Sequence, residues 1–374
     1  MSKFSLFKCA SVMCASLLFL TGCATSNSTN SSTSASVEAS SESLDQGSSV
    51  SEDAKDPNKK ISIVTTIFPE YDWVREIVGN HADKFEITYL MNKGVDLHSY
   101  QASAEDIAKV SSADLFIYVG GESDTWAEDA IAEATNKDMK VINLLNSLGS
   151  DVKEEEVVEG MEAEDEHDHD HSEEAKDHDH ADEAKEHDHD HDHAKEGEEV
   201  EYDEHVWLSI KNAETIVSAI EVKLAEIDPD NKAEYEKNAN DYLAKLDELD
   251  KEYKDTLSSI QNKTIIVGDR FPFRYLVNEY GIKYYAAFKG CDAGSEASFE
   301  TVKFLANKMD ELNMSDIFII DGSKGDLAKT IVDNTKDKNA KVLVLDSMQS
   351  TKSSDNASYL DIMKKNLEVL KEVL

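Results

Sequence analysis

The sequence predicts an α/β fold with two lobes, each a parallel sheet flanked by helices, bridged by one long helix. Short β-branched runs alternate with amphipathic helical patterns over 59–232 and again over 263–374, which is typical of parallel sheets covered on both faces. A long helical pattern over 233–262 separates the two series. The 374 residues suffice for two domains of modest size. Ligands of such sheets bind beyond the carboxyl ends of strands, so residues that follow strands are the candidates for a site.

Residues 1–22 have the features of a lipoprotein signal peptide. Lys3 and Lys8 precede the apolar run 9–20, which is too short to cross a bilayer as a mature helix. The run ends in Leu20-Thr21-Gly22-Cys23, which resembles a bacterial lipoprotein cleavage site and implies cleavage before Cys23 and lipidation of that residue. We therefore expect an extracytoplasmic protein that is lipid-anchored to the bacterial cell membrane.

The segment 23–58 is predicted to be a disordered tether, because it is rich in Ser and Thr and has almost no large apolar residues. A flexible coil of about 35 residues spans roughly 33 Å, which would keep a domain close to a partner in the membrane. With Cys23 acylated, Cys291 is the only thiol left, so the mature chain has no intramolecular disulfide available.

The first lobe begins with a β-branched run that ends before Pro69 and leads into a helical pattern stopped by Gly79. The alternation then continues as far as the acidic segment 151–204. The elements expected in this lobe, in chain order, are strand 61–67, helix 73–78, strand 85–91, helix 104–110, strand 115–119, helix 126–134 and strand 140–143.

Two helical patterns follow the acidic segment, 210–227 and 233–260, with Asp228-Pro229 as the break between them. The second helix is long enough to connect the lobes; a coiled-coil dimer is disfavoured because its heptad pattern is short, and we expect a monomer. The second lobe is expected to contain strand 264–267, helix 273–280, strand 284–287, helix 299–312, strand 317–321, helix 327–335, strand 342–345 and helix 359–370.

The acidic segment 151–204 carries nine of the twelve histidines, each beside an Asp, and holds 27 acidic and four basic residues. Imidazole and carboxylate groups are common ligands of divalent transition metals, so the tract reads as an accessory metal-collecting loop, with a solvated acidic linker as the alternative. The net charge of −40 argues against a nucleic-acid-binding surface. The histidines of the tract are His167, His169, His171, His178, His180, His187, His189, His191 and His193.

Three histidines lie outside the tract. His81 follows a Gly-Asn turn and is interpreted as a loop residue. His98 lies in Gly94-Val-Asp-Leu-His98-Ser-Tyr100 after a predicted strand, and His205 lies in Asp203-Glu-His205-Val-Trp207, where the tract returns to ordered structure. Each of these two, taken alone, could be a turn residue as readily as a ligand.

Together with Thr65-Thr-Ile-Phe-Pro69 and 113–120, these two histidine motifs resemble the metal-binding receptors of bacterial ABC importers for zinc and manganese, in particular the zinc-type branch. The similarity runs from about Lys60 to Leu374. It implies that a metal ion is bound in the cleft between the lobes. It also implies that the permease and the ATPase of the importer are separate chains.

The resemblance implies a ligand set that this sequence matches only in part. His98 and His205 match the first two ligands, and Asp346, after a strand, matches the closing carboxylate. The third position falls on Arg270, whose guanidinium cannot ligate a cation. We predict Asp269 as the fourth ligand of Zn²⁺, because zinc prefers about four ligands. Water, Asp321 and Glu296 are the alternatives, and Asp269 could equally pair with Arg270 or Arg274.

The predicted function is capture of zinc outside the cytoplasm and its delivery to an ABC importer permease. Mn²⁺ remains the alternative ion, and a metal-storing surface adhesin is the alternative role. We do not expect an enzyme, because the sequence has no H-E-x-x-H, G-x-S-x-G or phosphate-binding G-x-x-x-x-G-K-[ST] motif. Since neutral imidazole is the ligand, metal binding is expected to weaken as the pH falls through roughly 6.5.

Overall fold

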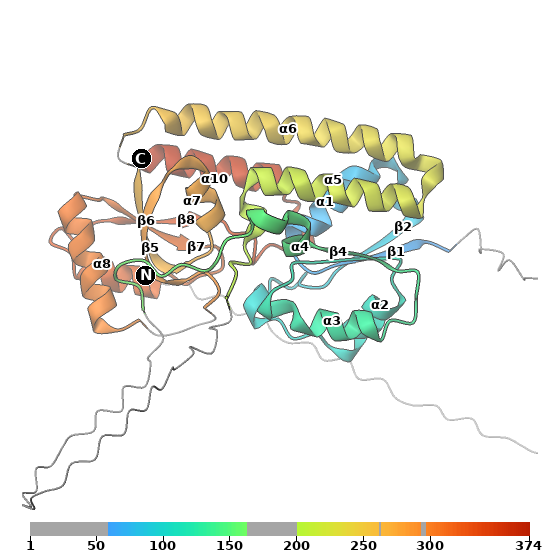
Figure 1. The fold of residues 1–374 in the computed structure, drawn as a ribbon. Coiled ribbons are helices and arrows are strands. Elements are labelled where there is room, and N and C mark those ends of the chain that lie inside the picture. The colour runs from blue at the N-terminus through green and yellow to red at the C-terminus, as the bar shows by residue number, and fades with distance from the viewer. Residues whose placement is uncertain (1–58, 163–199, 262, 293–296) are drawn as a thin grey trace, which may run out of the picture. The chain divides into compact units, whose positions relative to one another are not determined.

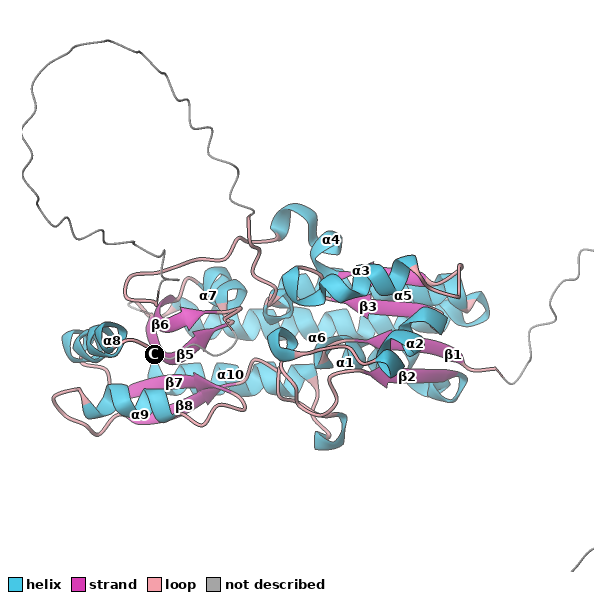
Figure 2. Cartoon of the chain, turned by 90° about the horizontal axis from the view of Figure 1, so that it is seen from below, coloured by secondary structure: helices cyan, strands magenta, loops and turns pink. Residues whose placement is uncertain are grey.

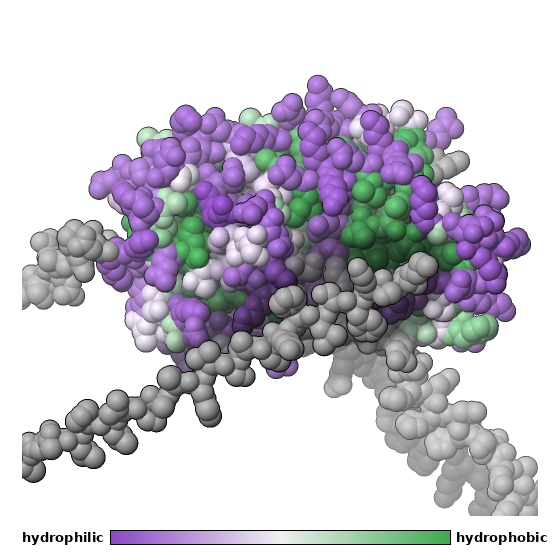
Figure 3. Space-filling model, turned by 180° about the vertical axis from the view of Figure 1, so that it is seen from behind, coloured by the Kyte–Doolittle hydropathy of each residue, from purple (hydrophilic) through white to green (hydrophobic). Residues whose placement is uncertain are grey.

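The computed structural model describes residues 59–162, 200–261, 263–292 and 297–374. The signal peptide, Cys23, the tether, the nine histidines of the tract and Glu296 lie outside these ranges, so the predictions made for them stay predictions. Among the described residues, no helix is long and apolar enough to cross a membrane. Hydrophilic residues dominate the face of the molecule drawn in Figure 3, with apolar side chains visible between them.

The first sheet consists of four parallel strands in the order β2-β1-β3-β4. Alternate residues of β1 enter separate cores: Ile63 packs with α1, α5 and α6, whereas Val64 packs with α2 and α3 on the other face (Figure 1). The elements are β1 (Ile61–Thr65), α1 (Phe68–Val78), β2 (Phe85–Tyr89), α2 (Ala104–Ser112), β3 (Leu115–Tyr118), α3 (Thr125–Ala132), β4 (Lys140–Asn143), α4 (Leu144–Leu148) and α5 (Ile210–Ile227).

The second sheet repeats the same topology, with parallel strands in the order β6-β5-β7-β8 (Figure 2). Ile266 of the central strand packs with α8 and α9, and its neighbours Ile265 and Val267 face α6, α7 and α10. The elements are β5 (Thr264–Phe271), α7 (Arg274–Tyr280), β6 (Lys283–Lys289), α8 (Phe299–Leu312), β7 (Asp316–Ile320), α9 (Asp326–Asp333), β8 (Lys341–Leu345) and α10 (Tyr359–Val373).

The long helix α6 (Lys232–Ser258) joins the two halves into one core. It contacts α1 and α5 of the first lobe and α7 and α10 of the second (Figure 1). Its buried face includes Tyr242, Leu246 and Tyr253, and the Tyr253 hydroxyl donates to the Met363 carbonyl of α10 at 2.6 Å. The core of the first lobe therefore continues without interruption into that of the second.

The predicted α/β architecture with two parallel sheets and a bridging helix is confirmed, and the differences are local. The short helix α4 was not predicted, since five residues show no helical period. Strand β5 extends beyond the predicted 264–267, and its pairing with β6 shifts register between Val267 and Arg270. Asp269 and Arg270 consequently lie within an irregular strand end and not in a loop after it.

Glu70 of α1 is a fully buried carboxyl group near the end of β1. Its Oε2 accepts hydrogen bonds from the backbone N–H groups of Thr66 at 2.8 Å and Ile67 at 3.3 Å. Burial raises the pKa of Glu70 to about 8, and the carboxylate of Asp124 adds to the rise. The folded protein therefore keeps a proton on Glu70 at pH values where the unfolded chain has lost it.

This proton gives a stability prediction. Between pH 4.5, the ordinary value, and about 8, the folded state binds more protons than the unfolded state, so the free energy of unfolding falls as the pH rises. The Glu70 contribution falls by up to about 1.4 kcal/mol per pH unit. Glu70→Gln keeps an acceptor oxygen and removes the ionisation, so urea denaturation of both proteins across this range should show the wild type losing stability relative to the variant. A pH-independent difference would contradict the assignment.

Candidate metal centre

His98 is held at the first lobe's side of the site by a short turn. The 3-10 turn Leu97–Ser99 follows β2, and the Asp96 carboxylate caps it by accepting from the His98 backbone N–H at 3.0 Å. The His98 side chain is nearly buried. This local cap explains the Asp-x-His spacing of the motif, because it fixes the backbone from which the imidazole projects.

His205 enters the site from the segment that follows the acidic tract. It has no exposed surface. The Asp203 carboxylate accepts a hydrogen bond from the His205 backbone N–H at 2.8 Å and lies 2.9 Å from the His205 Nδ1. The turn Val206–Leu208, which lies entirely in the core, follows directly. His205 is thus anchored on both sides, by a carboxylate before it and by packed apolar residues after it.

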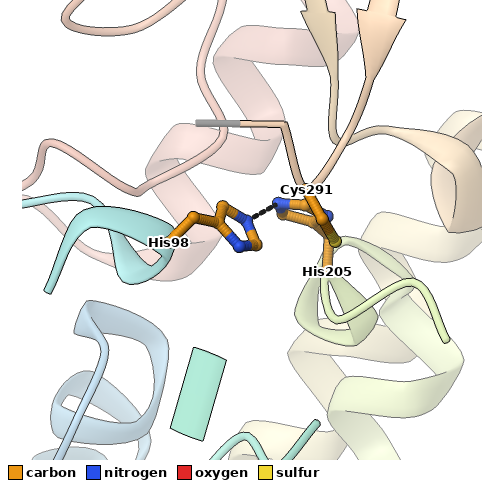
Figure 4. Close-up of side chains that lie close together, drawn as sticks. All are labelled: His98, His205 and Cys291. Carbon is orange, nitrogen blue, oxygen red and sulfur yellow. Dashed lines mark hydrogen bonds between the residues drawn. The ribbon is translucent and has the colours of Figure 1, made fainter. Parts of the chain in front are cut away.

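The two imidazoles meet with their Nε2 atoms 3.0 Å apart (Figure 4). The Nδ1 of His205 faces the Asp203 carboxylate, and the Nδ1 of His98 lies 2.8 Å from the Ser123 hydroxyl and 3.4 Å from a Glu204 carboxylate oxygen. These oxygen partners favour a proton on each Nδ1, which leaves a lone pair on each Nε2. The two Nε2 atoms are at hydrogen-bonding distance when one of them carries a proton, and with both protons on Nδ1 the two lone pairs can bind one cation between them. The arrangement therefore suits a divalent metal ion.

Burial keeps both imidazoles in the neutral form that binds metals. It lowers the pKa of His98 to about 2, with neighbouring His205 adding to the effect, and lowers the pKa of His205 to about 4. The loss of metal through imidazole protonation, expected from the sequence near pH 6.5, is therefore moved to more acidic solution. Burial also raises the pKa of Asp203 and of Glu204 to about 7, and a cation beside them would favour their charged forms.

A thiol that the sequence did not single out lies in the same group. The ligand atoms of His98, His205 and Cys291 all lie within 4.8 Å of one another (Figure 4), and those of Glu155, Asp203 and His205 form a second, overlapping group. Cys291 follows β6 by two residues. The available signal was its position after a strand, but the sequence reasoning used Cys291 only to exclude a disulfide.

The two predicted carboxylate ligands occupy other places. The described residues contain neither Asp346 nor Asp269 within the two groups that surround the histidines. Asp346 Oδ1 accepts from the Met348 N–H at 2.8 Å, and Asp269 accepts from the Arg270 N–H at 3.0 Å. The alternative Asp321 is engaged by the backbone and hydroxyl groups of Ser347 and Ser350. The structure brings the two histidines together but does not bring these carboxylates to them.

Arg270 has a partner in the opposite lobe. Its guanidinium forms an ion pair with Asp96, with Nη1 3.2 Å from Oδ1, so it contacts the same carboxylate that caps the His98 turn. A cavity of about 270 Å³ lies here, lined by residues of both lobes. Arg270 stands where the family pattern expects a metal ligand. Its positively charged side chain instead joins the two lobes beside the histidines.

Both ends of the acidic tract pack against the second lobe. Glu154 and Tyr202 form an antiparallel bridge, and the Tyr275 hydroxyl of α7 donates to the Asp203 carbonyl at 2.9 Å. Glu162 accepts from the backbone N–H of Ser298, which caps α8, at 2.9 Å. The described chain therefore leaves for the tract beside β6 and α8, and returns from it at Val200, five residues before His205.

Comparisons with known proteins agree with this architecture. A family model described as zinc-uptake complex component A, periplasmic (ZnuA), matches residues 63–373. The zinc-binding lipoprotein AdcA of Streptococcus pneumoniae is 30% identical over 323 residues, which cover 85% of this chain but 56% of AdcA. The high-affinity zinc uptake system protein ZnuA of Bacillus subtilis is 30% identical over 327 residues, covering 87% of this chain and 92% of that protein. The Zn(II)-bound ZnuA-like domain of Streptococcus pneumoniae AdcA superposes with a TM-score of 0.60 at 26% identity, covering 84% of this chain and 98% of that domain.

Proposed function

The chain belongs to the ZnuA family of zinc-uptake components, and from this premise we propose that it is an extracytoplasmic receptor that binds zinc and delivers it to an ABC importer permease. Since it spans 56% of the length of the AdcA relative, the proposal concerns the receptor unit alone. The proposed role is that of a binding receptor and not of an enzyme, which agrees with the description of the family as a zinc-uptake component. The observation that carries the proposal is the pair of buried imidazoles whose Nε2 atoms lie 3.0 Å apart.

His98 and His205 are the ligands we propose first. Zn–N bonds of about 2.0–2.1 Å at a tetrahedral angle place two nitrogens roughly 3.3 Å apart, so a small separation of the rings admits the ion. The oxygens at both Nδ1 atoms then fix ring orientation and ligand basicity. Asp346 and Asp269 stay predictions as carboxylate ligands, because neither belongs to the two groups around the histidines and each accepts a hydrogen bond from a nearby backbone N–H.

The partners follow from the receptor role. The permease and the cytoplasmic ATPase are proposed as separate chains, and a lipid on Cys23 is proposed to hold the receptor at the membrane near them. Zinc is the proposed cargo, as it is in the names of AdcA and ZnuA. Manganese as the ion and a metal-storing adhesin as the role remain alternative predictions from the sequence.

The tract is proposed as a weaker, multi-site collector that supplies the buried site. Replacing its nine histidines with Asn, with the chain length kept, should leave one tight zinc site and remove most of the weaker ones. Calorimetric titration of the two proteins would measure both classes, and uptake at scarce zinc should fall in the variant. A comparison variant that changes nine Asp or Glu residues of the tract to Asn or Gln measures how much of the weak binding depends on carboxylates. Unchanged stoichiometry and uptake in the histidine variant would remove the collector role.

A further inference from the structure

Cys291 reaches the two histidines because the loop after β6 approaches the His205 ring closely. A Cβ added at Gly290 would lie 3.1 Å from both Cε1 and Nδ1 of His205 and 2.8 Å from the Phe271 carbonyl oxygen. Only glycine leaves room for this approach. The Cys291 backbone N–H donates to Glu155 Oε1 at 3.2 Å, which fixes the loop on its other side. The thiol is thus placed at the histidine pair by contacts on both flanks.

We propose that Cys291 is the third protein ligand of the zinc ion, bound as a thiolate, in place of the side chain that the family pattern expects at Arg270. The inference rests on the proposed zinc-receptor function and deepens it by assigning the donor set. Arg270 itself is committed to the ion pair with Asp96. Two imidazole nitrogens and one sulfur would then be the protein ligands of the ion, with the fourth position left to a carboxylate or a water molecule.

The geometry needs only small movements. Zn–S bonds of about 2.3 Å and Zn–N bonds of about 2.0–2.1 Å place sulfur and nitrogen roughly 3.6 Å apart at a tetrahedral angle. The three ligand atoms already lie within 4.8 Å of one another, so shifts of about 1 Å complete the set. Burial and the Glu155 carboxylate raise the pKa of the free Cys291 thiol, so the metal itself must displace the thiol proton, which is released to solvent on binding.

A thiolate changes which ions the site prefers. Sulfur is a soft ligand that suits zinc, whereas manganese is bound best by carboxylate, carbonyl and water oxygens. Asp346 and Asp269 together with two imidazoles would suit either ion. Cys291 would therefore be the residue that sets the preference for zinc over manganese in this chain.

Cobalt(II) substitution tests the proposal without an uptake assay. The mature full-length chain, titrated with one equivalent of cobalt, should show a thiolate-to-cobalt charge-transfer band in the near ultraviolet. Cys291→Ser should lose the band, bind zinc at least about 100-fold more weakly, since loss of a partner one shell further out already costs roughly 10- to 100-fold, and discriminate less against manganese. Cys23→Ala, in a chain expressed from residue 23, removes the other cysteine of the mature chain. It should keep the band and serves as the matched control.

The outcomes separate the two proposals. If the wild type binds zinc tightly but shows no thiolate band, or if Cys291→Ser retains the band, the ligand assignment is overturned while the receptor function stands. If the wild type does not bind zinc tightly, the receptor function itself fails. Circular dichroism of the metal-free Cys291→Ser variant checks its fold. The cobalt spectrum of the wild type tests the assignment even if that variant does not fold.

Discussion

Replacing His98 with Ala is expected to lower the zinc affinity of the buried site by about 1,000-fold or more, since loss of a partner one shell further out already costs roughly 10- to 100-fold. The variant loses one of the two imidazoles that face each other at 3.0 Å, and the remaining groups cannot replace a neutral nitrogen donor. Because burial already keeps His98 neutral, the loss should be similar at pH 6 and pH 8. Competition with a chromogenic zinc chelator measures the affinity.

His81→Ala is the matched control, because it removes a histidine of the same lobe that lies outside the site. The His81 Nε2 is 2.8 Å from a carboxylate oxygen of Glu234 on α6, so it makes a hydrogen bond there but joins neither cluster of candidate ligands. Its zinc affinity should equal that of the wild type. Equal losses in the two variants would point to a general effect on the fold, and no loss in His98→Ala would remove His98 from the site.

Trp207→Ala is expected to lower the free energy of unfolding of the metal-free protein by about 3–5 kcal/mol. The side chain is fully buried, two residues after His205, and its indole N–H donates to the Ser347 carbonyl of the second lobe at 2.9 Å. The Tyr359 hydroxyl of α10 donates to the Trp207 carbonyl at 2.8 Å. The substitution therefore leaves a cavity and an unpaired buried carbonyl where the two lobes meet.

Trp207→Phe separates these two effects. It keeps most of the apolar volume and loses only the indole donor, so we expect a loss of about 1–3 kcal/mol. Urea denaturation followed by circular dichroism compares the three proteins without relying on tryptophan fluorescence. If the Ala variant is no less stable than the Phe variant, the packing of this side chain is not what stabilises the junction.

Local patterns were sufficient to predict the architecture. The predicted alternation of strands and helices agrees with the two observed sheets. Two short motifs singled out His98 and His205, which are 107 positions apart in the sequence and which the fold brings together. A motif predicts well here because its polar neighbours act locally: Asp96 and Asp203 each bind the backbone two residues onward. Such contacts are encoded within a few residues of sequence.

Contacts between residues far apart in the sequence were not predictable in the same way. Cys291 joins the site because Gly290 lets one loop press against the His205 ring, a contact that no residue period reveals. Asp346 does lie beyond the end of β8, as expected. However, Met348 adopts a φ of 67°, and its N–H donates a hydrogen bond to the Asp346 carboxylate. The predicted position of Asp346 at the end of β8 was correct. The direction of its side chain depends on a turn that the sequence does not specify.

Because α6 packs both sheets into one core, a clam-shell opening of the lobes would expose buried aromatic side chains such as Tyr242 and Tyr253. Each Å² of apolar surface exposed costs about 25 cal/mol, which opposes large rotations. At the proposed zinc site, exit of the ion would then depend on the turn Leu97–Ser99, which carries His98, and on Gly290 and Cys291. The residence time of zinc at the proposed site should accordingly follow the opening rate of these short segments, and the permease proposed as partner could accelerate release by displacing them alone.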